Sequence, residues 1–152
     1  MKRSPELTPL SHDHQHALDA ALRLRRAEHH TVADAIAYFA RFFEREGRPH
    51  FAIEESLILP ALPADDPEWA PGVQRVRDDH EAIRARAGAL AEQRTAEEAL
   101  GAARALGERL AAHVRFEERE LFPTLERRLT DAELADLGAA VAAAERRGTS
   151  PG

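Results

Sequence analysis

The chain has 152 residues, about the size of one domain, and a formal net charge of −6 from 21 basic and 27 acidic residues. It contains eight histidines and no cysteine. The lack of cysteine excludes a disulfide scaffold, a cysteine-type zinc finger, an iron–sulfur cluster and a thiol nucleophile. The negative charge argues against a nucleic-acid partner, because no net positive field attracts phosphate.

No segment of the sequence is typical of a membrane span or a secretory signal. The longest apolar stretch, residues 137–144, is far shorter than the roughly 18 residues that a transmembrane helix needs. The first ten residues contain two basic residues but no apolar segment behind them. We therefore expect one cytoplasmic domain over residues 1–152, with no membrane partner.

Apolar residues recur three and four positions apart along the chain, which is the period of an α-helix. Thr8 before Pro9 is typical of a helix start, and Thr95 and Thr130 each begin a capping box. A cluster of Pro, Gly and Asp over residues 60–72 indicates a loop. The pattern predicts helices over about residues 9–29, 32–59, 72–93, 96–128 and 131–146, followed by a frayed tail over residues 147–152.

The connections between the long helices are short, except for the loop that starts at Pro60. Short connections place consecutive helices side by side and antiparallel. We therefore predict an all-α fold, an up-down-up-down four-helix bundle with its core over about residues 9–128 and a short fifth helix and tail over residues 130–152. Gly47 and Pro49 lie inside the second helix, but the apolar stripe keeps its phase across them, which favours a kinked continuous helix.

Each of the four long helices has an apolar inward stripe that is interrupted by one histidine at a similar level. The second and fourth helices add a glutamate four residues after their histidine, and positions i and i+4 share one face of a helix. The predicted polar cluster in the bundle interior consists of His14, His50, Glu54, His80, His113 and Glu117.

Such a cluster is not stable as an ordinary core, because an unpaired buried carboxylate costs much free energy. A bound cation removes that cost. Mixed imidazole and carboxylate ligands suit iron, manganese or zinc better than calcium or magnesium. The sequence therefore predicts a buried metal site made of these six side chains.

The chain also contains an internal repeat. Residues 50–62 align with residues 113–125, so that the histidine, both following glutamates, the proline and the final leucine match in register. Upstream, the pair Asp13-His14 matches Asp79-His80. Two helical hairpins that each supply one histidine and then one HxxxE motif build a site of approximate two-fold symmetry. This arrangement suits two metal ions bridged by two carboxylates.

The order and spacing of these residues resemble the hemerythrin-like family, the HHE cation-binding domain, from about residue 10 to residue 128. The resemblance implies a four-helix bundle that holds two iron ions, bridged by an oxo or hydroxo group and two carboxylates, and that binds dioxygen, nitric oxide or iron. By position, His14 and His50 bind one iron and His80 and His113 the other, while two glutamates bridge them. Zinc or manganese is the alternative metal.

One position departs from the family pattern. Oxygen-carrying hemerythrins have a fifth histidine one turn after the first histidine of the third helix, and here that position is Arg84, which cannot bind a metal. This difference argues against reversible oxygen carriage but leaves metal binding intact. Glu55, Glu81, Glu118 or water remain candidates to complete the ligand set. Glu55 and Glu118 are also alternatives for the bridging carboxylate, although position i+5 lies about 140° round the helix from its histidine, which favours i+4.

The other four histidines have simpler interpretations. His12 and His16 flank His14 at a spacing of two residues, and one of them replaces His14 if the first helix is rotated. The repeated Asp-His pair favours His14. His29 and His30 fall near the end of the first helix, where a cation suits the helix dipole.

Three functions fit these features. The first is a non-enzymatic di-iron protein that binds dioxygen or nitric oxide, or senses redox state or iron. The second is a di-iron oxidase or peroxidase with ferritin-like chemistry, but such enzymes use ExxH motifs and no histidine here follows a glutamate by three residues. The third is a regulatory or repair module that acts on a protein partner through the fifth helix.

Overall fold

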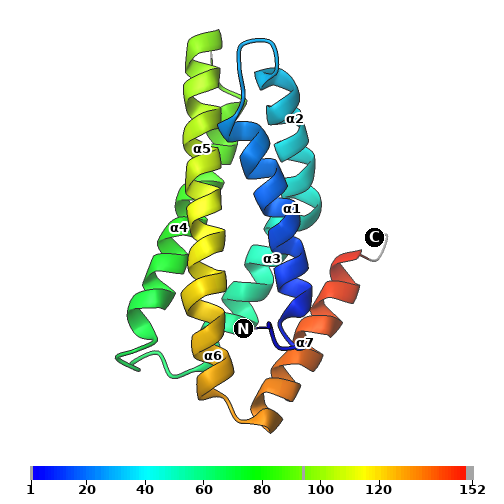
Figure 1. The fold of residues 1–152 in the computed structure, drawn as a ribbon, viewed down its shortest axis with the longest axis vertical. Coiled ribbons are helices and arrows are strands. Elements are labelled where there is room, and N and C mark those ends of the chain that lie inside the picture. Colours follow the sequence, from blue (N-terminus) through cyan, green and yellow to red (C-terminus); the bar gives the residue numbers. More distant parts are fainter. Residues whose placement is uncertain (1, 94, 150–152) are drawn as a thin grey trace.

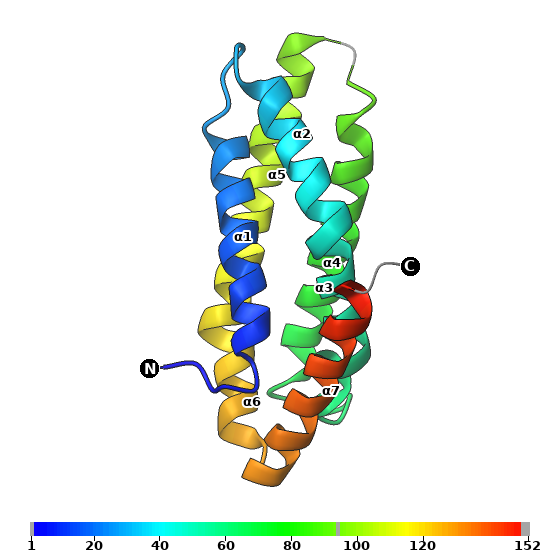
Figure 2. The same ribbon diagram turned by 90° about the vertical axis from the view of Figure 1, so that its right-hand side faces the viewer.

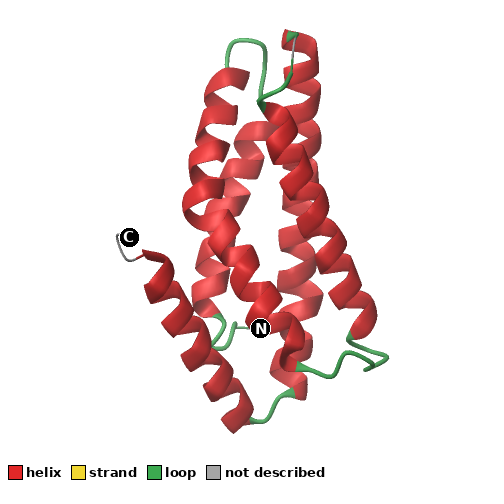
Figure 3. Cartoon of the chain, turned by 180° about the vertical axis from the view of Figure 1, so that it is seen from behind, coloured by secondary structure: helices red, strands yellow, loops and turns green. Residues whose placement is uncertain are grey.

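The computed structural model describes residues 2–93 and 95–149, which are helical except for the connecting loops (Figure 3). No strand occurs in this part of the chain. The helical elements are α1 (Thr8–Arg25), α2 (Val32–Phe42), η1 (Phe43–Gly47), α3 (Arg48–Ile53), η2 (Glu54–Ile58), η3 (Leu59–Ala61), α4 (Ala70–Leu90), α5 (Ala96–Phe116), η4 (Glu117–Leu121), α6 (Phe122–Arg128) and α7 (Asp131–Thr149).

These elements form four antiparallel rods: α1, the run from α2 to η3, α4, and the run from α5 to α6 (Figure 1). α1 packs against α2 and α5, and α4 packs against α5. α7 lies outside the bundle, along α3 and η2 (Figure 2). The predicted all-α bundle with an additional C-terminal helix is confirmed. Across residues 2–93 and 95–149, no helix combines the length and the apolar character needed to cross a bilayer.

The second rod stays helical through Gly47 and Pro49, as predicted, and the reason is a change of helix type. Each of the three π-helical segments, η1, η2 and η4, ends two residues before a proline, which is Pro49, Pro60 or Pro123. A proline ring clashes with the carbonyl four residues earlier and lacks an N–H. In each case the residue before the proline donates its N–H to the carbonyl five residues back, so the helix widens locally and continues.

Several helix ends differ from the sequence prediction. α1 ends at Arg25 rather than near His29, because two backbone N–H bonds close its last turn at Arg26. α4 begins two residues earlier and ends three residues earlier than predicted. α7 extends to Thr149, so the expected fraying is wrong for residues 147–149, and residues 150–152 lie outside the described part.

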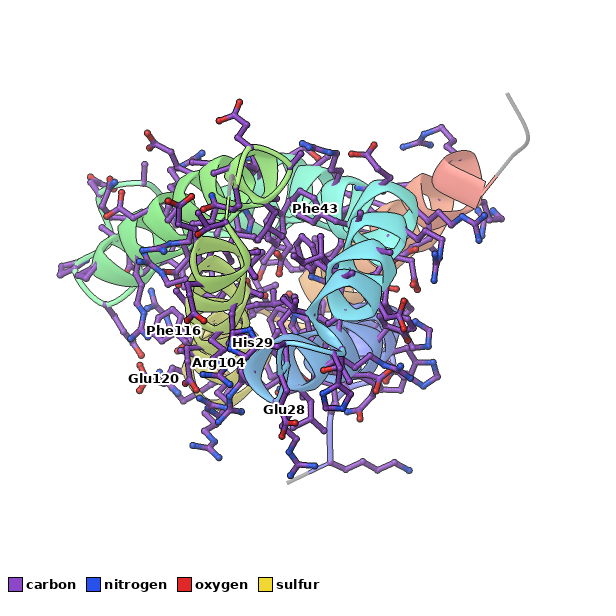
Figure 4. All side chains as sticks on the ribbon, turned by 90° about the horizontal axis from the view of Figure 1, so that it is seen from above. Glu28, His29, Phe43, Arg104, Phe116 and Glu120 are labelled. Carbon is purple, nitrogen blue, oxygen red and sulfur yellow. The ribbon has the colours of Figure 1, made fainter. Side chains whose placement is uncertain are left out.

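The bundle interior has two apolar clusters with a polar layer between them. One cluster, with Leu24, Phe39 and Leu106, fills the end where α1 meets α2. The other, with Leu10 and Leu125, fills the opposite end and includes residues of α7. Figure 4 looks along the bundle, and Phe43, which is buried, lies among the side chains inside the ring of helices. The two clusters hold the four rods at a fixed separation around the polar layer.

Candidate metal centre

All six predicted side chains meet in this polar layer. They come from all four rods: His14 from α1, His50 and Glu54 from the second rod, His80 from α4, and His113 and Glu117 from the fourth rod. None of the six is more than 5% exposed. Their ligand atoms form two groups that could each hold a metal ion, namely His14, His50, Glu54 and Glu117, and Glu54, His80, His113 and Glu117.

The two groups share both glutamates, and within each group the ligand atoms lie within 4.8 Å of one another. The distances that involve Glu117 show how the carboxylate spans the groups. Its Oε2 is 3.2 Å from Nε2 of His14, and its Oε1 is 2.6 Å from Nε2 of His113. Glu54 does the same from the other side, with Oε2 3.3 Å from His50 Nε2 and Oε1 3.1 Å from His80 Nε2. Each glutamate therefore faces one histidine of each group.

Several of these buried atoms have no hydrogen-bond partner. They are His113 Nε2, Glu54 Oε2 and both carboxylate oxygens of Glu117. In addition, the Nε2 atoms of His14 and His50 point at each other across 3.2 Å. Unsatisfied buried polar groups are costly and rare in proteins. Cations between these atoms satisfy them together, so the residues present fit two metal ions with imidazole and carboxylate ligands.

A second set of carboxylates faces the outer nitrogens of the histidines, and three of the four contacts are hydrogen bonds. The Nδ1 atom of His50 is 3.0 Å from Asp13, and that of His113 is 3.1 Å from Asp79. In the same way, Nδ1 of His80 is 2.7 Å from Glu55, and Nδ1 of His14 is 3.6 Å from Glu118. Metal-binding histidines commonly donate their other N–H to a carboxylate, which fixes the ring and keeps the inner nitrogen free to bind.

The sequence predicted no role for Asp13 and Asp79, and it offered Glu55 and Glu118 only as direct metal ligands, although the repeat contains a signal for all four. Asp13 and Asp79 are the acidic members of the repeated Asp-His pairs, and Glu55 and Glu118 are the second glutamates of the repeated HxxxEE motifs. Each aspartate contacts the histidine of its own hairpin, whereas each glutamate contacts a histidine of the other hairpin. The glutamate contacts therefore tie the two hairpins together.

The charges in the metal-free centre favour ion pairs. Burial alone lowers the pKa of His113, but the charge of Glu117 and the hydrogen bond to Asp79 raise that pKa to about 10. Burial likewise raises the pKa of Glu117, but His113 and the other polar neighbours hold the pKa well below its usual value. The same balance, with Glu54 as the main partner, raises the pKa of His50 well above its usual value.

The structure separates the alternatives that the sequence left open. His12 and His16 lie on the exposed side of α1, and His16 pairs with Glu46 at the surface. The rotation of α1 therefore places His14 inside. Glu81 is exposed on α4 and points away from the centre.

Arg84, at the position of the fifth histidine of oxygen carriers, has a different role here. Its two Nη atoms lie 2.8 and 2.9 Å from the oxygens of Glu55, which in turn contacts His80. The guanidinium therefore supports an outer carboxylate, and Glu55 and Glu118 stand outside the histidines rather than between the two groups.

A cavity of about 20 Å³ adjoins the centre. It is lined by three of the histidines, by apolar and aromatic side chains and by the polar residues at its mouth: His14, His50, His113, Ala17, Phe42, Phe43, Phe51, Leu110, Val114, Gly47, Asp13 and Glu46. This volume holds about one water-sized molecule. The cavity therefore has room for a diatomic ligand but not for an organic substrate.

An antiparallel four-helix bundle with a histidine from each of its four rods and two shared glutamates defines a class of helical cation-binding domains. The chain matches the model of the hemerythrin family, described as the hemerythrin HHE cation binding domain, over residues 7–125. It therefore belongs to this family, as the sequence resemblance predicted. Neither the curated proteins nor the solved structures contain a match to the chain.

Proposed function

We propose that this chain is a non-haem di-iron protein that binds dioxygen or nitric oxide, or senses redox state or iron, and does not act as an enzyme. The observation that carries the proposal is the pair of buried four-residue groups that share Glu54 and Glu117. Two cations that share two carboxylates match this arrangement, because each glutamate faces one histidine of each group.

Each residue of the centre has a defined task in this proposal. His14 and His50 hold one iron, and His80 and His113 hold the other. The outer carboxylates accept a hydrogen bond from Nδ1 of His50, His80 and His113, so that the lone pair of each Nε2 points into the bundle. Phe51, whose ring stacks 3.7 Å from that of His80, and Phe122, which stacks on His14, restrict the rotation of two of these rings.

The neighbouring cavity supports a small ligand. When bound, a ferrous pair would supply electrons and open coordination positions for dioxygen or nitric oxide. His14, His50 and His113 border the cavity, while the side chains of Phe43 and Leu110 exclude bulk water from it. Because the cavity is too small for an organic substrate, its size supports ligand binding rather than turnover of such a substrate.

The test is anaerobic loading with ferrous iron, followed by metal analysis and absorption spectra before and after exposure to air or nitric oxide. We expect two irons per chain, the bands of an oxo-bridged diferric pair after air, and distinct bands after nitric oxide. A Glu81→Ala variant is the matched control, because Glu81 is exposed on α4. Far less than two irons per chain, or a spectrum that neither gas changes, contradicts the proposal.

The non-enzymatic role and the cytoplasmic location are tested by separate measurements. Steady-state oxidation of ferrous iron or of a peroxidase dye that disappears in Glu54→Ala contradicts a purely binding role. The cytoplasmic location that the sequence predicts is checked by fractionation of the native cells.

A further inference from the structure

The two halves of the centre are alike where the metal ligands lie. Each half has two histidines, and both halves share the same two glutamates. Each histidine also has one outer carboxylate, and the aspartates Asp13 and Asp79 occupy equivalent places, 3.0 and 3.1 Å from Nδ1 of His50 and His113. The other two outer contacts differ, because Nδ1 of His80 is 2.7 Å from Glu55 whereas Nδ1 of His14 is 3.6 Å from Glu118, and the surroundings of the outer carboxylates differ more.

Arginines surround the outer carboxylates of the half that contains His80 and His113. The Asp79 carboxylate lies 2.9 Å from Arg109 Nε and Nη2, and Arg75 Nε is 3.9 Å away. Glu55, which contacts His80, accepts two bonds from Arg84. Both carboxylates of this half are therefore neutralised by guanidinium groups.

The half that contains His14 and His50 has the opposite surroundings. Among the described residues, no arginine or lysine forms an ion pair with Asp13, which instead lines a recess together with Glu145 of α7. Arg45 borders the same recess, of about 100 Å³, without pairing to Asp13, and Glu46 borders it too.

The second outer carboxylate of this half, Glu118, is also less neutralised than Glu55. Its side chain accepts a hydrogen bond from Ser11 Oγ at 2.9 Å, and Arg3 Nε is 3.6 Å away. Arg3 at the same time pairs with Glu126. One arginine thus serves two carboxylates here, whereas Glu55 has Arg84 to itself.

We propose that the two metal positions are inequivalent, and that the position of His14 and His50 binds a divalent cation first and more tightly than the position of His80 and His113. This inference rests on the proposed metal centre. Arg109 and Arg84 act as positioning residues that weaken the second position, and Glu145 strengthens the first.

Two physical effects act in the same direction. A carboxylate that is paired with a guanidinium is largely neutralised, so Asp79 and Glu55 contribute less negative potential to a cation held by His113 and His80. The guanidinium charges also repel a cation directly, although water partly screens this repulsion because the Arg84 and Arg109 side chains are 37% and 38% exposed. Near Asp13 the extra carboxyl group of Glu145 attracts the cation instead.

The test uses zinc, which has no redox chemistry, added to the metal-free full chain at one equivalent. Crystals of this form are measured at the zinc absorption edge, and the anomalous peaks at the two positions are compared. Changes in the partners outside a metal site alter affinity by about 10- to 100-fold. At one equivalent the occupancy ratio of two independent sites is the square root of their affinity ratio, so we expect a peak ratio of about 3 to 10 in favour of His14 and His50. A calorimetric titration with zinc gives the affinities of the two binding steps, which can be compared with the two peaks.

Two substitutions check the cause. Arg109→Gln keeps a hydrogen-bond donor to Asp79 but removes the charge, and we expect it to tighten the weaker binding step and bring the peak ratio toward 1. Glu145→Arg gives Asp13 the kind of partner that Asp79 has, and we expect it to weaken the stronger step. Arg86→Gln removes an exposed arginine of α4 that has no partner in the described part of the chain, so it controls for net charge.

The outcomes separate this inference from the proposed centre. Equal peaks, or a larger peak at His80 and His113, overturn the inequivalence while leaving the metal centre in place. If Arg109→Gln weakens the second step instead of tightening it, Arg109 has only a structural role and its charge is not the cause. Zinc that binds at neither position contradicts the metal centre itself.

Discussion

The two hairpins of the bundle, residues 8–61 and 70–128, present the same inner chemistry in different surroundings. Each supplies one histidine, then an HxxxE motif that enters a π-helical turn at its glutamate, before a proline. Their exteriors differ, because α7 packs along α3 and η2 of the first hairpin and brings Glu145 to the recess that Asp13 lines. The comparison teaches that a repeated sequence duplicates the ligands, whereas the charges around them depend on neighbours outside the repeat.

The largest expected effect comes from removing a shared ligand. Glu54→Ala and Glu117→Ala each take a carboxylate from both groups, so we expect each to lower the metal affinity by about 1,000-fold, or about 4 kcal/mol. The two variants should behave alike because the residues are equivalent in the repeat. Metal analysis after dialysis against a weak chelator measures the effect, and retention of two metals by either variant contradicts a shared role.

The next effect is the pH dependence of the metal-free protein. The pKa of His113 is raised from 6.5 to about 10 in the folded state, against burial, by Glu117 and Asp79. A raised pKa means that its stabilisation is complete below about pH 6.5 and is lost as the pH rises toward 10. We therefore expect the free energy of unfolding, measured with urea, to be a few kcal/mol lower at pH 10 than at pH 7.

The metal-loaded protein provides the control for that measurement. Its histidines are deprotonated when they bind the metal, so its stability should change much less between pH 7 and pH 10. If the free energy of unfolding falls equally in the two forms between pH 7 and pH 10, His113 does not carry a proton in the metal-free protein.

A smaller effect tests the contact between the hairpins. A Cβ atom added at Gly107 of α5 lies 2.7 Å from the carbonyl oxygen of Ala21 and 2.9 Å from the backbone nitrogen of Arg25, both rigid parts of α1. We expect Gly107→Ala to destabilise the protein by about 1–3 kcal/mol. Gly101→Ala on the same helix meets nothing within 4 Å and should stabilise by up to about 1 kcal/mol. If thermal unfolding shows the same change in stability for Gly107→Ala and Gly101→Ala, the close α1–α5 contact is ruled out.

The smallest expected effect concerns Glu145 on α7, the helix that packs on the first hairpin. Burial, together with Asp13, raises the pKa of Glu145 to about 7 from 4.5. For a carboxyl group with a raised pKa, ionisation destabilises the fold, so stability falls as the pH rises from about 4.5 to 7. Glu145→Gln should therefore be more stable than the natural protein at pH 8 but not at pH 5. Asp136→Asn, on the exposed side of α7, should change neither value.

The helical period and the capping residues predicted most of the fold. The capping boxes at Thr95 and Thr130 are present, with bonds from Glu98 N and Glu133 N to the threonine hydroxyls at 3.1 Å. The end of α1 was predicted four residues too late, since helical propensity continues through residues 26–29 and only the turn into α2 ends the helix. Helix ends depend on such turns, which a periodic pattern does not contain.

The sequence by itself determined the bundle and the six buried side chains, because helical spacing decides which residues share a face. Tertiary structure decided which partner each side chain meets. The bonds from Asp13 and Asp79 to His50 and His113, and the pairing of Arg109 with Asp79, join residues 30 to 37 positions apart. Spacing along one helix carries no information about such contacts, because they depend on how the rods are rotated and packed against each other.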